Sequence, residues 1–255
     1  MIANYHTHTW RCKHAEGIER EYIEKAIDGG LKILGFSDHT PMPYPKGYVS
    51  DVKMDMNQLE DYVDTILKLK AEYRKDMEIH LGLEVEYYPR YLEELLKAVH
   101  QYPIEYFLLA QHYLGNEIND FYSGTPTDSE EYLKRYCMQS QEALETGLFT
   151  YFAHPDLLNF SGNAEIYHKW MHQLCSHAKR LDIPLEINFL GIRGKRHYPN
   201  PDFWKIAGDV GNKVIFGADA HQPKTVWDPE ILSAAKKMVD EFGLNLIDTV
   251  TFRKP

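Results

Sequence analysis

The chain has 255 residues, of which 44% are hydrophobic and 26% charged, and its formal net charge is −10. This composition is typical of a globular protein with a full core, and the acidic balance argues against a nucleic-acid-binding surface, which is usually basic. No apolar run reaches the roughly 18 residues of a membrane-spanning helix, and the N-terminus lacks the features of a signal peptide. The three cysteines are widely spaced, which favours free thiols in a reducing compartment, so we expect a cytoplasmic protein.

Short apolar segments rich in β-branched residues alternate with segments of helical periodicity along the chain. Strands are predicted at residues 2–6, 32–37, 77–84, 106–112, 149–154, 184–190 and 213–219. Residues 246–251 are compatible with a short eighth strand. Strand alternating with helix seven times indicates parallel β/α units. Because no linker or repeat divides the chain, we expect a single domain over residues 1–255.

Several helix boundaries are also visible in the sequence. A helix is predicted from Leu59 to Tyr73, opened by a capping box from Asn57 to Glu60. Three further helices are expected to begin with a proline in the first turn, at Pro89, at Asn200–Pro201 and at Asp228–Pro229. Gly243 is expected to end the last helix. The first strand is not followed by a glycine-rich phosphate loop, so a closed barrel of about seven strands is favoured over an open nucleotide-binding sheet.

Histidines and single carboxylates fall at the ends of six of the seven predicted strands. They are His6 and His8 after the first strand, Asp38 and His39 after the second, Glu84, His112 and His154 at the ends of the third to fifth, and Asp219 and His221 after the seventh. The carboxyl ends of the strands in a β/α barrel meet at one face, where such enzymes carry their active sites. The sequence therefore predicts a shared metal centre at that face.

The local spacing of these residues fits metal binding. In extended backbone, residues two apart point the same way, so His6 with His8 and Asp219 with His221 are each able to bind one centre. Mixed nitrogen and oxygen ligands suit zinc, manganese or iron. A carboxylate among several imidazoles is a natural bridge between two cations, and Glu84 is assigned that role. His168 and His172 lie on a predicted outer helix and are expected to face solvent.

Seven segments give the chain a family resemblance. They are YHTHTWRCKHAEG, GFSDHTPMP, HLGLEVEYYP, AQHYLG, AHPDL, LEINFLGIRGK and FGADAHQP, in order from residue 5 to residue 223. With these segments the chain resembles the polymerase-and-histidinol-phosphatase superfamily, and within it the histidinol-phosphatase branch. The resemblance implies an α/β fold, a distorted seven-stranded (β/α)7 TIM-like barrel, and a centre of two or three divalent metal ions.

The resemblance also implies how the ligands are shared among the metal ions. The first ion would be bound by His6, His8, Glu84 and Asp219, the second by Glu84, His112 and His154, and the third by His14, His39 and His221. His14 lies in a loop and is implied by the resemblance alone. Asp38, next to His39, is expected to orient the ligands without binding a metal ion itself.

The expected reaction is hydrolysis of a small phosphate monoester, most simply L-histidinol phosphate in histidine biosynthesis. A hydroxide bridging two metal ions would attack phosphorus in line. Asp156 or His39 would protonate the leaving alkoxide, and Arg193 or Arg196 would bind the phosphate. Where relatives often carry a basic residue, near Asn159, this chain has none. Glu186 and Asn188, two apart on the sixth predicted strand, are expected either to orient the amine or a ligand, or to form core hydrogen bonds.

Three other classes of protein share parts of this pattern. Another phosphoesterase of the same superfamily, acting on nucleotides, cyclic phosphates or phosphotyrosine, would have the same metal ligands. An amidohydrolase also begins with His-x-His and ends with a strand-end aspartate, but it usually needs a strand-end lysine that this chain lacks. A non-catalytic metal-binding module is the third alternative, and the complete ligand set argues against it.

Overall fold

The computed structural model describes all residues, 1–255, as one α/β arrangement. The strands are β1 (Ala3–Asn4), β2 (Ile33–His39), β3 (Glu78–Glu86), β4 (Tyr106–Ala110), β5 (Phe149–Phe152), β6 (Leu185–Asn188), β7 (Lys213–Gly217) and β8 (Asn245–Leu246). The α-helices are α1 (Glu19–Asp28), α2 (Leu59–Glu72), α3 (Pro89–Val99), α4 (Glu130–Glu145), α5 (Ala164–Arg180), α6 (Phe189–Arg193), α7 (Pro201–Val210) and α8 (Pro229–Phe242). Short 3-10 helices are η1 (Trp10–Cys12), η2 (Met56–Gln58) and η3 (Pro223–Thr225).

The strands form one parallel sheet in the order of the chain, β1 to β8. The expected strand count of seven is therefore wrong, because β8 adds a two-residue strand that pairs with Lys213 and Val214 of β7. Its second residue, Leu246, is the first residue of the segment 246–251, which the sequence had made compatible with an eighth strand. The equally short β1 has two buried residues, whereas β8 has one exposed and one half-buried residue, so β8 gives a weaker apolar signal in the sequence.

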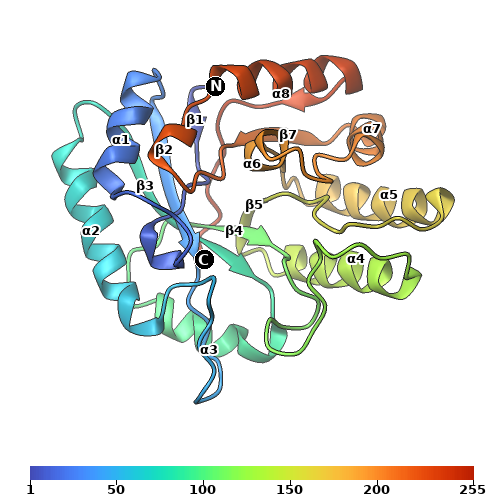
Figure 1. Ribbon diagram of the computed structural model, residues 1–255, viewed down its shortest axis with the longest axis horizontal. Helices are drawn as coiled ribbons and strands as arrows, with labels where there is room; N and C mark the ends of the chain where they lie inside the picture. Colours follow the sequence, from blue (N-terminus) through green and yellow to red (C-terminus); the bar gives the residue numbers. More distant parts are fainter.

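The sheet curls, and the helices cover its outer face (Figure 1). The segment after β1 reaches the segment after β7 through a bridge between Thr7 and Ala220. The amide of His8 donates to the carbonyl of Ala220 at 3.0 Å, and the amide of Ala220 donates to the carbonyl of His6 at 3.3 Å. This bridge places His6 and His8 beside Asp219 and His221, which lie about 210 residues later in the chain.

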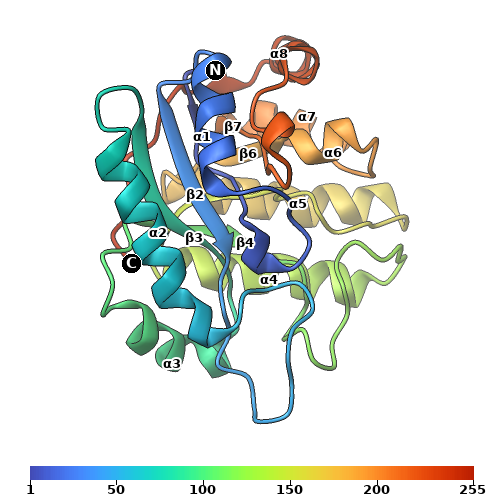
Figure 2. The same cartoon turned by 60° about the vertical axis from the view of Figure 1, so that its left-hand side comes forward.

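The core has two parts. A cluster of 55 buried residues lies between the curled sheet and the helices. A smaller cluster of seven, which includes Tyr5, Tyr106 and Tyr151, fills the inside of the curl. The C-terminal segment crosses beneath this inner cluster, where the ring of Phe252 stacks on Tyr106 with ring centroids 4.7 Å apart. Figure 2 shows α1 and α2 side by side on the outer face. No helix combines the length and apolar character needed to cross a membrane.

Most of the predicted helix boundaries are confirmed. Pro89, Pro201 and Pro229 begin α3, α7 and α8, and Gly243 ends α8 in the left-handed conformation with φ of 61°. The predicted capping box from Asn57 to Glu60 is wrong. The box lies at Asp55 and Gln58 instead, because a turn of 3-10 helix precedes α2 and takes the cap.

Candidate metal centre

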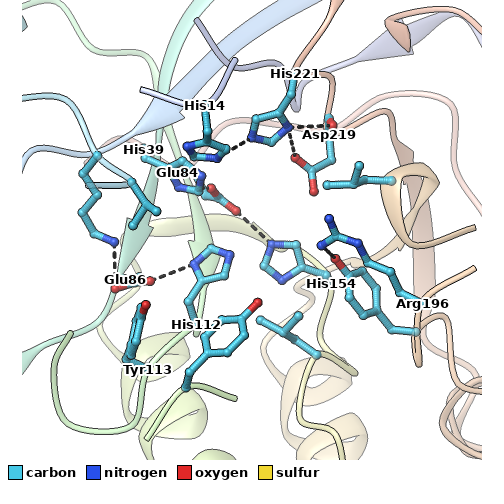
Figure 3. Close-up of a pocket in the computed structure, with 16 residues that line it drawn as sticks. His14, His39, Glu84, Glu86, His112, Tyr113, His154, Arg196, Asp219 and His221 are labelled. Atoms are coloured by element: carbon cyan, nitrogen blue, oxygen red, sulfur yellow. Dashed lines mark hydrogen bonds and ion pairs between the residues drawn. The ribbon is translucent and has the colours of Figure 1, made fainter. Parts of the chain in front are cut away.

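Eight of the nine predicted ligands meet at the carboxyl ends of the strands. Figure 3 shows His14, His39, Glu84, His154, Asp219 and His221 among them. The eight residues form four overlapping groups in which the ligand atoms lie within 4.8 Å of one another. The groups are His6–His8–Asp219, His6–Glu84–His154, His8–His39–Glu84 and His14–His39–His221. Glu84 belongs to two of them, as expected of a bridging ligand. Cys12, which the sequence did not single out, forms a further group with His8 and His221.

Several buried polar atoms in these groups have no hydrogen-bond partner. They are His6 Nε2, His8 Nδ1 and Nε2, Glu84 Oε2, His154 Nδ1 and Asp219 Oδ1. Some of them lie close to another ligand atom, as Glu84 Oε2 does at 2.7 Å from His39 Nδ1, but without the geometry of a hydrogen bond. Buried polar atoms in folded proteins are nearly always hydrogen-bonded, so a concentration of unpartnered ones marks a place for a ligand. Imidazole nitrogens mixed with carboxylate oxygens suit zinc, manganese or iron. The residues present thus fit a group of divalent cations.

The charges of the side chains in the cluster also fit bound cations. Burial opposes a proton on His8, but nearby carboxylates, led by Asp219, raise its pKa to about 9. Burial also opposes charge on Glu84, yet His39 and His6 hold its pKa well below the usual range. Burial and His8 lower the pKa of His221 to about 3. The buried carboxylates pair only with histidines, with no lysine or arginine among their partners, which leaves room for cations to balance them.

Two candidate ligands have unusual backbone conformations. His154 has φ of 31° and Asp219 has φ of 45°, in the region that non-glycine residues rarely adopt. Such strain costs of order 1–3 kcal/mol and persists where the surrounding contacts hold it. Both residues follow short strands, β5 and β7, and the sharp change of direction turns their side chains toward the cluster. Their conformation is therefore consistent with a functional requirement.

His112 is the predicted ligand that the structure leaves outside the four groups. Its ring lies 4.9 Å from the ring of His154, and its Nδ1 donates to Glu86 Oε1 at 2.7 Å. A carboxylate that accepts a hydrogen bond from Nδ1 fixes the tautomer of the imidazole and leaves the lone pair on the other nitrogen, Nε2. Glu86 was missed, although its position two residues after Glu84 on β3 places both on one face of the strand.

The cluster forms one wall of a cavity of about 390 Å³. Arg196, Tyr198 and Lys53 line it with the ligands, and Nη1 of Arg196 donates to the hydroxyl of Tyr198 at 2.9 Å. Lys53 was missed by the sequence reasoning. It is almost fully buried and pairs with Glu117 at 2.9 Å, a contact between two distant loops that leaves no local pattern. The cavity volume of about 390 Å³ is in the range of small-molecule sites, roughly 300–1,000 Å³.

Two of the predicted catalytic residues lie outside this cavity. The Oδ2 atom of Asp156 accepts hydrogen bonds from the amide of Asn200 at 2.6 Å and from Nε1 of Trp204 at 3.0 Å. Arg193 points to the other side of α6, where its Nε lies 3.4 Å from Asp228 Oδ2. Of the four predicted catalytic residues, Arg196 and His39 thus lie in the cavity, and His39 is also one of the candidate ligands. Asp156 contacts α7 instead, and Arg193 contacts the start of α8.

The fold and this cluster define a parallel α/β protein with a candidate multinuclear metal centre at the carboxyl ends of its strands. The PHP domain family model matches residues 4–189, and the chain belongs to this family.

The chain is similar over nearly its whole length to histidinol phosphatases. A probable histidinol-phosphatase from Deinococcus radiodurans is 30% identical, covering 99% of this chain and 96% of its own. The histidinol-phosphatase of Lactococcus lactis is 24% identical over 98% of this chain and 95% of its own. A structure of the Lactococcus lactis histidinol phosphate phosphatase, complexed with zinc, L-histidinol and phosphate, superposes with a TM-score of 0.76 at 20% identity, covering 99% of this chain and 97% of that one.

Proposed function

We propose that the chain is a metal-dependent phosphatase, a single domain of residues 1–255, that hydrolyses L-histidinol phosphate to L-histidinol and phosphate. The observation that carries this proposal is the cluster of buried, unpartnered imidazole and carboxylate atoms. It lies on a chain that aligns over 99% of its length with a probable histidinol-phosphatase. The complex of the Lactococcus relative with zinc, histidinol and phosphate supports this choice of substrate.

Two or three zinc, manganese or iron ions would be held by the nine residues named from the sequence. Such ions, when bound, lower the pKa of a coordinated water and neutralise charge on phosphoryl oxygens. The chain holds the ligands close enough for this, since Glu84 Oε1 lies 3.2 Å from His6 Nε2 and 2.9 Å from His154 Nε2. Glu84 Oε2 lies 2.7 Å from His39 Nδ1, so the carboxylate faces both sides of the cluster.

Other residues of the cavity would bind and orient the substrate. Arg196 offers a guanidinium group that matches two phosphoryl oxygens. Glu86 lines the same cavity and lies 3.3 Å from Lys53, which also pairs with Glu117 at 2.9 Å, so two carboxylates against one lysine leave a net negative charge that favours a cationic amine. Neither of the two expected proton donors for the leaving alkoxide is retained, because Asp156 lies outside the cavity and His39 is itself a proposed metal ligand whose Nδ1 lies 2.7 Å from Glu84 Oε2.

The metal content of the purified protein tests the centre directly. After expression in metal-replete medium, elemental analysis is expected to find two or three transition-metal ions per chain, because four ligand groups overlap in the cluster. Replacing His168 and His172 by Ala is the control. These two histidines are exposed on α5 with ring centroids 5.9 Å apart, and their loss should leave the metal content unchanged. Less than one ion per chain in the unmodified protein would refute the centre.

Kinetics on a panel of phosphate esters test the substrate. We expect kcat/KM for histidinol phosphate to exceed that for a nucleotide, a phosphotyrosine peptide and a simple aryl phosphate, because only the first combines a phosphate with a small cationic leaving group. Equal metal content across the assays removes occupancy as an explanation. A preference of about tenfold or more for any other ester, equal to about 1.4 kcal/mol, would favour a different phosphoesterase activity of the same centre.

A further inference from the structure

Glu186 lies on β6, beneath the proposed ligands and outside the cavity lining, and it is completely buried. Its carboxylate accepts four hydrogen bonds, two at each oxygen. Oε1 accepts from Nδ1 of His6 at 2.8 Å and from the hydroxyl of Tyr151 at 3.3 Å. Oε2 accepts from the backbone amide of His154 at 3.1 Å and from Nδ2 of Asn188 at 2.9 Å. The geometry of Glu186 is therefore fully determined by its neighbours.

These contacts reach three of the proposed ligands, which follow three different strands. His6 is contacted through its ring and His154 through its strained backbone. Asp219 is reached through Asn188, whose Nδ2 also donates to Asp219 Oδ2 at 3.1 Å. Glu186 thus joins the ends of β1, β5 and β7 at a single carboxylate.

The contact with His6 decides which ring nitrogen faces the centre. A carboxylate only accepts hydrogen bonds, so the proton of the neutral ring stays on Nδ1. The lone pair is then on Nε2, which lies 3.2 Å from Glu84 Oε1 and 3.6 Å from Asp219 Oδ1 and has no hydrogen-bond partner. A lone pair facing two carboxylates is an arrangement that a cation stabilises.

The negative charge of Glu186 is not balanced by a lysine or arginine side chain. Its only ionic partner is His6. A buried carboxylate costs several kcal/mol of desolvation, and only part of that cost is offset by its four hydrogen bonds. The space itself is reserved for the carboxylate, since a Cβ atom on Gly217 would lie 1.7 Å from Glu186 Oε1.

We propose that Glu186 is the positioning residue of the metal centre. It keeps the proton of His6 on Nδ1, holds the backbone of His154 and orients Asp219 through Asn188, and its negative charge raises the affinity for cations. This inference rests on the proposed metal centre and adds a residue that does not touch the metal ions or the substrate.

The test is the zinc affinity of Glu186→Gln, measured by competition with a chromophoric chelator. Removing a carboxylate behind a ligating histidine typically weakens metal binding about 10–100-fold, and we expect a loss in this range. Thermal unfolding with and without zinc separates this role from a structural one. Without zinc the variant should unfold at a lower temperature, because the NH2 group of Gln leaves two of the four donors without an acceptor, and it should also gain less stability from added zinc than the unmodified protein does.

Two tyrosines inside the curl provide a matched pair. Tyr151→Phe removes one hydrogen bond to Glu186, and we expect it to weaken zinc binding by less than about tenfold. Tyr106→Phe removes a buried hydroxyl that donates to the carbonyl of Tyr5 at 2.7 Å and does not contact Glu186, so zinc affinity should not change. If Glu186→Gln does not fold, the comparison of Tyr151→Phe with Tyr106→Phe tests the role of Glu186 in its place.

The outcomes separate the inference from the proposed function. Zinc binding that is equal in the unmodified protein and in Glu186→Gln would overturn the role of Glu186 and leave the metal centre standing. A lower unfolding temperature of the metal-free variant with unchanged zinc affinity would assign Glu186 a structural role only. Unmodified protein that binds no zinc, manganese or iron would overturn the metal centre and this inference with it.

Discussion

Replacing Glu84 by Gln is expected to lower kcat by more than about 100-fold and to reduce the metal content. Glu84 belongs to two ligand groups, so one substitution removes negative charge from both. Losses from residues behind the ligands run to about 10–100-fold, and a ligand shared by two ions should exceed them. Steady-state kinetics with histidinol phosphate and elemental analysis of the same preparation measure both effects.

The control for Glu84 is a ligand at the edge of the cluster. His14 belongs to a single group and is more exposed than the others, so His14→Asn should affect one ion and reduce kcat less than Glu84→Gln does. Near-normal turnover of Glu84→Gln with full metal content would show that Glu84 does not bridge two ions.

Replacing Arg196 by Met is expected to lower kcat/KM for histidinol phosphate about 10–150-fold while leaving the metal content unchanged. Arg196 lines the cavity beside the proposed ligands. Loss of a hydrogen bond to a charged group costs about 1.5–3 kcal/mol, which gives this range at 1.36 kcal/mol per decade. Kinetics at saturating and at low substrate concentration separate the effect on kcat from the effect on KM.

Arg193 provides a matched control three residues away on the chain. It lies outside the cavity and contacts Asp228 and the carbonyl of Thr225, so Arg193→Met should leave kcat/KM nearly unchanged. A larger loss for Arg193→Met than for Arg196→Met would mean that the phosphate approaches from the other side of α6.

The alternation of strands and helices was predictable because it rests on local periodicity. A strand repeats every two residues and a helix every 3.6, and proline and glycine mark helix ends through their own backbone preferences. The parallel order of the sheet followed from that alternation. The strand count did not, since β8 has only two residues, one exposed and one half-buried.

The grouping of the candidate ligands was also largely predictable from the sequence. His6 and His8 are two apart in extended backbone, and their side chains share a direction before any tertiary contact forms. The carboxyl ends of parallel strands lie at one edge by construction, so residues there meet regardless of the loops between them. This is why Glu84, His154 and Asp219 were expected at one place and lie in the same groups.

The sequence by itself thus determined the class of fold, the family and the edge at which the ligand types gather. Only the tertiary structure decided which of two arginines on one short segment faces the cavity, and that Asp156 turns away to α7. The structure also showed that Glu186 joins three strand ends. Such choices depend on contacts between residues far apart in the chain, because loop paths and side-chain partners are set by packing and leave no periodic signal in the sequence.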